Sequence, residues 1–221
     1  MRRGSDLISV FLVDDHELVR TGIRRILEDV RGIRVVGEAE NGENAVQWCR
    51  DNNSDVILMD MNMPGIGGLE ATKKILRVRP DIRIIVLTVH TEDPFPTKVM
   101  QAGASGYLTK CSAPDEMIQA IRAVHSGQRY ISAEIAQQMA LSQFKSHDIE
   151  NPFKALSERE LQIMLMITRG NKVNDIAEQL SLSPKTVNSY RYRLFDKLQI
   201  NGDVELTRMA MRYGMLDSLP L

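Results

Sequence analysis

Over residues 1–130, short runs of aliphatic and β-branched residues alternate with stretches in which apolar residues recur every three or four positions. The first pattern is typical of buried strands and the second of amphipathic helices, so their alternation predicts an α/β fold with a doubly wound parallel sheet. We predict five strands, at residues 10–13, 34–37, 55–59, 84–87 and 106–108. Helices are predicted between and after them, at about residues 18–27, 42–52, 68–78, 95–102 and 114–126.

The first predicted helix has its apolar residues in adjacent pairs four positions apart. Residues at this spacing share one face of a helix, so we expect this face to cover the sheet. The face consists of Leu18, Val19, Gly22, Ile23, Ile26 and Leu27.

The strand pattern ends near residue 130. A short amphipathic stretch at 131–141 leads into residues 142–152, where polar residues dominate and periodicity is lost, as expected of a connecting segment. We therefore predict a first domain at residues 7–130, a linker with a short helix at 131–153, and a second domain at 154–217.

Only helical patterns follow the linker. Ser157 and Glu160 have the spacing of a capping box, and Gly170 is suited to the end of the helix that the box begins. Ser183 followed by Pro184 is typical of another helix start. Together with apolar spacing, these signals predict an all-α four-helix domain, with its later helices at about 173–180, 184–198 and 203–213.

Composition supports two compact domains and excludes several classes of protein. The chain has 221 residues, of which 43% are hydrophobic and 26% charged, which is close to an average soluble protein. Its apolar runs are far shorter than the ~20 residues that span a bilayer, and the N-terminus lacks a secretory signal pattern. Two cysteines, Cys49 and Cys111, favour reduced thiols in the cytoplasm, and four scattered histidines show no metal-ligand spacing.

Acidic residues follow two of the predicted strands. Asp14 and Asp15 come after the first strand and Asp60 after the third. The carboxyl ends of parallel strands meet at one edge of a sheet, so these carboxylates should lie close together. Thr88 and Lys110 follow later strands at the same edge. Any one acid here could be an ordinary helix cap, but five such positions in order indicate a site where a carboxylate accepts a phosphoryl group.

A divalent cation would offset the repulsion among the three carboxylates, and Mg²⁺ prefers such oxygen ligands. We expect Asp15, Asp60 and the backbone carbonyl of Asn62 to bind it, with Asp14 orienting a ligand water. Residues 63–65 are expected to turn the chain away sharply after that carbonyl.

Four segments resemble the receiver domain of two-component response regulators: residues 12–16, residues 58–65, Thr88 and residues 107–110. The resemblance implies that a histidine kinase phosphorylates Asp60 and that Mg²⁺ binds at Asp14, Asp15 and Asp60. It also implies that Lys110 neutralises a phosphoryl oxygen and that Thr88 reorients together with Tyr107.

An enzyme of another class, a phosphatase that forms an aspartyl phosphate with Mg²⁺, is the alternative for this site. Such enzymes place a second aspartate two residues after the nucleophile as a general acid and base. Asn62 occupies that position here and cannot exchange protons, so we expect a stable phosphoryl group rather than turnover.

The predicted helix at 184–198 has an apolar side and a polar side. Val187, Leu194 and Leu198 share the first. Amide, hydroxyl and basic side chains of this kind suit the major groove of double-stranded DNA. The polar side carries Lys185, Asn188, Ser189, Tyr192, Arg193 and Lys197.

The charge of the second part of the chain and the order of its helices support a DNA-binding role for this helix. Residues 1–150 hold 18 basic and 21 acidic residues, and residues 151–221 hold 10 and 8. A solvated helix face would explain a charged strip alone, but a preceding helix and short turn make the arrangement a helix-turn-helix.

Residues 156–160 and 182–187 are similar to the DNA-binding domain of the LuxR/NarL (FixJ-type) family. The resemblance implies that Asn188, Ser189 and Tyr192 face bases, while Lys185, Thr186 and Arg193 hold the DNA backbone. Members often carry lysine at the positions of Asn188 and Tyr192, so their base preferences do not transfer.

Residues 92–103, 126–131 and 188–193 resemble the GacA/UvrY/VarA branch of that family over nearly the whole chain. This implies a BarA/GacS-type sensor kinase as phosphodonor and activated transcription of small RNAs that antagonise the translational regulator CsrA/RsmA. We expect phosphorylation to release the DNA-binding domain or to make it a homodimer. A constitutive DNA-binding protein is the alternative that explains only the second domain.

Overall fold

The computed structural model describes residues 7–88, 95–145, 151–213 and 215, and it divides the chain into two compact units, Met1–Met139 and Ala140–Leu221. Residues 1–6, His90, the 92–94 part of the predicted branch pattern, His147 and the end of the predicted second domain lie outside the described residues. Among the described residues, no helix is long and apolar enough to cross a membrane.

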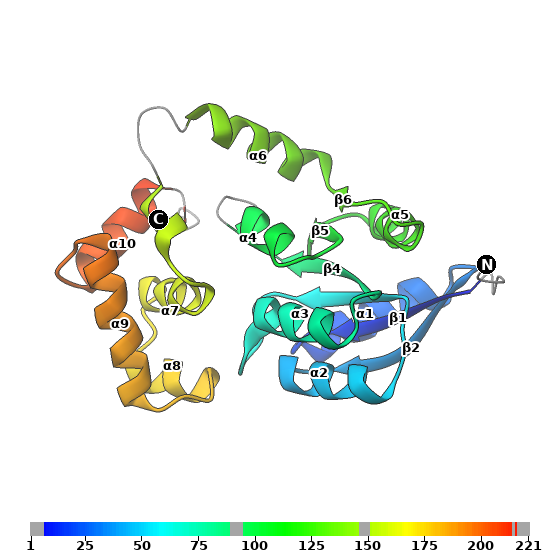
Figure 1. Ribbon diagram of the computed structural model, residues 1–221, viewed down its shortest axis with the longest axis horizontal. Coiled ribbons are helices and arrows are strands. Elements are labelled where there is room, and N and C mark those ends of the chain that lie inside the picture. The colour runs from blue at the N-terminus through cyan, green and yellow to red at the C-terminus, as the bar shows by residue number, and fades with distance from the viewer. Residues whose placement is uncertain (1–6, 89–94, 146–150, 214, 216–221) are drawn as a thin grey trace. The chain divides into compact units, whose positions relative to one another are not determined.

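The first unit is built on a parallel sheet with the order β2-β1-β3-β4-β5-β6 (Figure 1). Because β1 lies between β2 and β3, the winding direction reverses there, as expected for a doubly wound fold. The strands are β1 (Ile8–Val13), β2 (Ile33–Ala39), β3 (Val56–Asp60), β4 (Arg83–Thr88), β5 (Gly106–Thr109) and β6 (Tyr130–Ile131).

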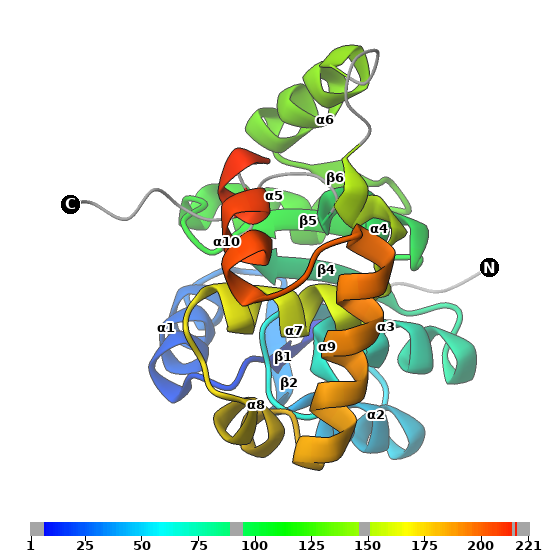
Figure 2. The same ribbon diagram turned by 90° about the vertical axis from the view of Figure 1, so that its left-hand side faces the viewer.

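Helices cover both faces of this sheet. Figure 2 shows α1 and α5 on one side and α2, α3 and α4 on the other. On the first side, α1 and α5 share a core with inward residues of the central strands. On the second, Trp48 of α2 stacks on Phe11 of β1 with ring centroids 3.9 Å apart. The helices are α1 (Glu17–Glu28), α2 (Gly42–Asp51), α3 (Gly67–Val78), α4 (Phe95–Gln101) and α5 (Pro114–His125).

The parallel α/β class is confirmed, but the predicted number of five strands misses one. The additional strand, β6, pairs with β5 through Gly106–Tyr130 and Tyr107–Ile131. Two residues are too few to show an alternating pattern, so only the edge of β5 makes them a strand. The following helix, α6 (Ala133–Lys145), extends beyond the predicted amphipathic stretch at 131–141.

The predicted buried face of α1 is partly wrong. Leu27 is buried, and Ile23 and Ile26 pack against the core, but Leu18 is 86% exposed and Gly22 is also exposed. Successive residues of a helix are about 100° apart around its axis, so Leu18 points well away from the face centred near Val19 and Ile23.

Over its described residues beyond α6, the second unit contains four α-helices and a short 3₁₀ helix. Its core includes residues from all four α-helices together with Phe153, Leu156, Leu180 and Met215. The expected capping box of Ser157 and Glu160, the left-handed Gly170 and the Ser183 cap before Pro184 are all present. The helices are η1 (Pro152–Ala155), α7 (Glu158–Thr168), α8 (Val173–Gln179), α9 (Pro184–Leu198) and α10 (Asp203–Arg212).

Candidate phosphoacceptor and DNA-binding sites

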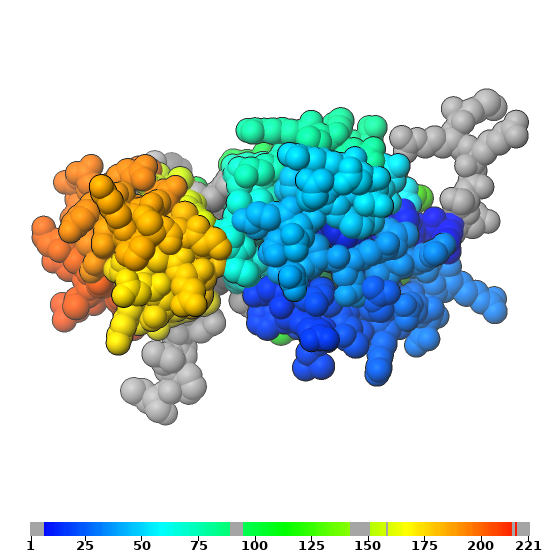
Figure 3. Space-filling view, turned by 90° about the horizontal axis from the view of Figure 1, so that it is seen from below, coloured from blue at the N-terminus to red at the C-terminus, as the bar shows by residue number. Residues whose placement is uncertain are grey.

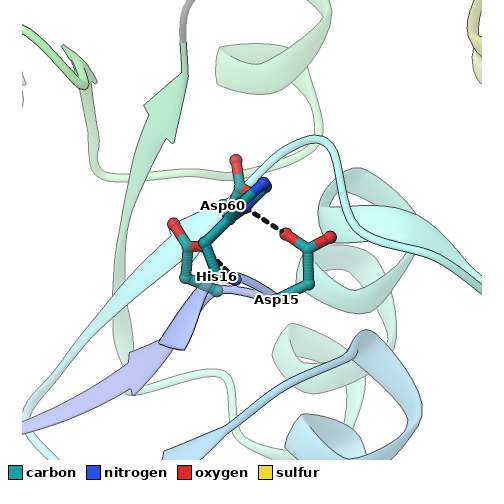
Figure 4. A group of neighbouring side chains, drawn as sticks. Asp15, His16 and Asp60 are labelled. Atoms are coloured by element: carbon teal, nitrogen blue, oxygen red, sulfur yellow. Dashed lines mark hydrogen bonds and ion pairs between the residues drawn. The ribbon is translucent and has the colours of Figure 1, made fainter. Parts of the chain in front are cut away.

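The sequence-predicted acids converge at the carboxyl edge of the sheet. Val13 of β1 lies beside Met59 of β3, so the residues that follow them emerge side by side. Asp14, Asp15, His16 and Asp60 each offer a ligand atom, and these atoms lie within 4.8 Å of one another. Figure 4 shows the side chains of Asp15 and His16 from the β1–α1 loop next to that of Asp60.

Asp60 is buried in this pocket, with 1% of its surface exposed. Its Oδ1 accepts the Asn62 backbone N–H at 3.2 Å, and its Oδ2 lies 2.9 Å from Lys110 Nζ. Burial raises the pKa of Asp60 to about 6 against the opposing charge of Lys110, and the neighbouring Asp14 raises it further. The carboxylate form of Asp60 therefore depends on the cations that surround it.

Lys110 joins two of the acids. Its Nζ lies 2.6 Å from Asp14 Oδ2, and with Asp60 it forms a second, weaker contact. Partial burial alone would lower the pKa of Lys110, but its bonds to Asp14 and Asp60 raise it above the ordinary value. The ammonium group is thus held charged at the position where the sequence predicts contact with a phosphoryl oxygen.

The donor set fits Mg²⁺. Three carboxylates supply hard oxygen ligands, and Asp15 Oδ1 is buried without accepting a hydrogen bond. A buried carboxylate oxygen without a donor is costly unless a cation satisfies it. Asn62 is exposed beside Asp60, where its backbone carbonyl was expected to contribute.

Thr88 ends β4 and Tyr107 lies near the start of β5. Both residues are fully buried, and their side chains are hydrogen-bonded to each other. Burial raises the pKa of the Tyr107 hydroxyl, so this group stays protonated. The sequence predicted that Tyr107 fills a space left when Thr88 moves. In this structure the ring already occupies a buried position.

Three residues near the pocket were missed by the sequence prediction. His16 Nδ1 lies 2.9 Å from Asp15 Oδ1, Arg20 Nη1 donates to the Asp14 carbonyl at 2.6 Å, and Glu43 of α2 accepts the Ile66 N–H of the β3–α3 loop at 3.0 Å. Arg20 and Glu43 bind backbone groups rather than side chains, and Glu43 reaches a segment 23 residues away, so neither contact leaves a spacing signal. The position of His16 directly after two acids was a usable signal.

The second candidate site is the polar face of α9. The apolar side is buried as predicted, through Val187, Leu194 and Leu198. In the space-filling view α8 and α9 form a continuous surface of the second unit (Figure 3). Tyr192 is 71% exposed, so its ring is accessible to a partner of this face.

The other predicted DNA contacts differ in how they are held. Lys185 and Ser189 are exposed, while Asn188 and Thr186 are half-buried, with Thr186 bonded to the Ser183 cap. Arg193 stacks over the Tyr190 ring at 4.6 Å and donates to the Ser189 carbonyl.

Lys197 makes an internal contact. Its Nζ lies 2.6 Å from Oε2 of the buried Glu160, an oxygen that also accepts the Ser157 N–H. Although burial would raise the pKa of Glu160, the bonds from Lys197 and Ser157 lower it. Lys197 therefore stabilises the start of α7, and of the predicted DNA contacts it is the one most occupied within the domain.

The comparison with known proteins agrees with this division. Residues 10–122 match the response regulator receiver domain, and residues 154–210 match the luxR family of bacterial regulatory proteins. The chain is 69% identical to the response regulator UvrY of Escherichia coli K12, over 96% of this chain and 97% of that protein. It belongs to the GacA/UvrY branch of the LuxR-type response regulators.

The similarity to two further proteins, GacA and RcsB, extends over nearly the whole chain. The response regulator GacA of Pseudomonas aeruginosa is 58% identical over 96% of this chain and 99% of its own. A structure of RcsB from Salmonella typhimurium is 26% identical, with a TM-score of 0.72 over 95% of this chain and 99% of its own. Another RcsB structure, with a TM-score of 0.58 over 93% and 98%, holds two dimers bound to two parallel DNAs.

Proposed function

We propose that this response regulator accepts a phosphoryl group on Asp60 from a BarA/GacS-type histidine kinase, and then activates transcription by binding double-stranded DNA as a homodimer. The observation that carries the proposal is the convergence of Asp14, Asp15, Asp60 and Lys110 at one edge of the sheet. A buried carboxylate between a cation and two further acids has the components of a phosphoacceptor.

The proposed phosphoryl transfer is a displacement at the phosphorus atom. A carboxylate oxygen of Asp60 attacks the phosphohistidine, the new P–O bond forms as the P–N bond breaks, and the electron pair remains on the imidazole nitrogen. Lys110, already beside Asp60, holds its ammonium group toward the oxygens that gain charge. Mg²⁺ held by Asp14, Asp15, Asp60 and the Asn62 carbonyl would neutralise charge on the phosphoryl oxygens.

Thr88 and Tyr107 are the proposed route from the site to the rest of the receiver. A phosphoryl group adds about −1.5 to −2 charge and draws the Thr88 hydroxyl as a hydrogen-bond donor. That movement changes the existing Thr88–Tyr107 bond. A nearly complete switch requires ~5 kcal/mol, so several contacts at this edge must change together.

The proposed DNA contacts are Lys185, Thr186, Asn188, Ser189, Tyr192, Arg193 and Lys197. Support comes from the helix-turn-helix arrangement of α8 and α9 and from the DNA-bound dimers of RcsB. The similarity to UvrY and GacA supports the proposal that the transcribed targets are small RNAs that antagonise CsrA/RsmA. Unpaired cysteines among the described residues and the response-regulator family support a cytoplasmic location.

Incubation with acetyl phosphate and Mg²⁺ tests the phosphoacceptor. Intact-protein mass measurement should show one added phosphoryl group on the wild type and none on Asp60→Asn, which keeps the shape of the buried side chain. Asp81→Asn, at an exposed aspartate, is the matched control and should be phosphorylated normally. Phosphorylation that persists in Asp60→Asn refutes the assignment, and sustained phosphate release from an ester would favour a phosphatase.

Arg193→Gln tests the DNA interface. Because a phosphate contact is independent of sequence, we expect weaker binding to every DNA tested and a salt dependence reduced by about one counterion. Arg77→Gln removes the same charge from an exposed position of α3 and should leave binding unchanged. Affinity and salt slope are measured by fluorescence anisotropy on the phosphorylated full chain. An unchanged slope contradicts the phosphate contact.

A further inference from the structure

His16 brings a nitrogen donor to the otherwise all-oxygen acidic pocket. Its Nδ1 lies 2.9 Å from Asp15 Oδ1 and 3.3 Å from Asp14 Oδ1 (Figure 4). Its backbone N–H donates to Asp14 Oδ1 at 2.8 Å, which fixes the start of the side chain. The imidazole is 64% exposed, so it lies on the open side of the pocket while Asp14 and Asp60 form the buried side.

These distances are those of neighbouring ligands around one cation. Metal–ligand bonds of about 2.1 Å at right angles place adjacent donors ~3.0 Å apart and opposite donors ~4.2 Å apart. The His16–Asp15 and His16–Asp14 separations match adjacent donors, and all four ligand atoms lie within 4.8 Å.

Asp15 gives an independent reason to expect a cation here. Its Oδ1 is buried and accepts no hydrogen bond, although His16 Nδ1 is only 2.9 Å away. A cation between the two atoms would satisfy both lone pairs. The alternative is that a protonated His16 simply forms an ion pair with the two aspartates, in which case the ring binds no metal.

We propose that His16 Nδ1 is a metal ligand, so that the pocket takes a first-row transition cation such as Ni²⁺ or Co²⁺ more tightly than Mg²⁺. This inference rests on the proposed function, because it uses the same pocket as the phosphoacceptor. Imidazole nitrogen binds these cations well, whereas Mg²⁺ prefers oxygen. The histidine thus widens the range of cations beyond what three carboxylates would select.

Mn²⁺ is a direct probe, because electron spin echo spectroscopy detects a nitrogen bound to it. With the full chain at about pH 8, where a metal-binding imidazole is neutral, we expect nitrogen modulation in the wild type and its loss in His16→Gln. His125→Gln, at an exposed histidine that ends α5, is the matched control and should keep the modulation. Bound Mn²⁺ without nitrogen modulation, or modulation that persists in His16→Gln, overturns the proposal.

Competition against bound Mn²⁺ gives a second readout. His16→Gln should weaken Ni²⁺ binding ~tenfold or more and leave Mg²⁺ binding within about twofold. Equal losses for both cations would overturn the proposed role. If the wild type binds no Mn²⁺ at all, the proposed phosphoacceptor site is contradicted as well. If it binds Mn²⁺ but His16 is not a ligand, only the present inference is contradicted.

Discussion

Gly68→Ala is expected to destabilise the receiver unit by about 3 kcal/mol or more, at the upper end of the cost of overpacking. A Cβ at this position would lie 1.9 Å from the Asp60 carbonyl oxygen and 2.9 Å from the Met61 Cα. Both neighbours are backbone, so neither can rotate away. The start of α3 must therefore move from the strand that carries the phosphoacceptor, and the Gly68 N–H bond to the Met61 carbonyl must lengthen.

Trp48 makes this effect measurable in the full chain. It is the single tryptophan of the sequence and stacks on Phe11 inside the receiver unit, so its fluorescence during urea unfolding reports on that unit. Gly22→Ala is the matched control, because no atom lies within 4 Å of a Cβ there. Gly22→Ala lies at an exposed position of α1 and should stabilise the protein by about 1 kcal/mol. If Gly68→Ala lowers the free energy of unfolding by less than about 1 kcal/mol, the close approach of Gly68 to the Asp60 carbonyl is not required.

Lys110→Met should cost about 3 kcal/mol in metal-free buffer near neutral pH, because it leaves buried Asp14 and Asp60 without their shared cation. Lys74→Met, which removes an exposed lysine 4.0 Å from Glu70, is the matched control and should change stability by less than ~0.5 kcal/mol. Saturating Mg²⁺ should restore more stability to Lys110→Met than to the wild type. Equal stability of Lys110→Met and wild type without metal would contradict the electrostatic account.

The pH dependence follows from Asp60. Its pKa is about 6 in the folded protein against an ordinary value of 3.8, so the folded state binds the proton more tightly than the unfolded state. Stability from this group is therefore fully present below the ordinary value and is lost as the pH rises through about 6. Removing Lys110 raises the pKa of Asp60 further, so the deficit of Lys110→Met should shrink in acid. Urea unfolding of both proteins across this range measures the difference.

Local signals were sufficient for much of the architecture. Helix caps at Ser157 and Ser183 depend on a few neighbouring residues, and the structure contains both as predicted. The convergence of Asp14, Asp15 and Asp60 also followed from sequence, because parallel strands place their carboxyl ends at one edge. Motifs of this kind are sufficient to identify the receiver and LuxR-type halves.

Long-range packing decided what the sequence could not. Strand β6 exists because the edge of β5 is available to pair with it, and Leu18 is exposed because the rotation of α1 about its axis depends on the sheet beneath it.

The same holds for individual side chains at both sites. The sequence predicts Lys197 as a DNA contact, and only the folded structure shows that this lysine also pairs with Glu160 of another helix. Apolar periodicity and caps are written in consecutive residues, so the sequence by itself determined the elements and the acidic edge. The strand partner of β5 and the ion-pair partner of Lys197 depend on groups brought together only by folding, and the tertiary structure alone decided them.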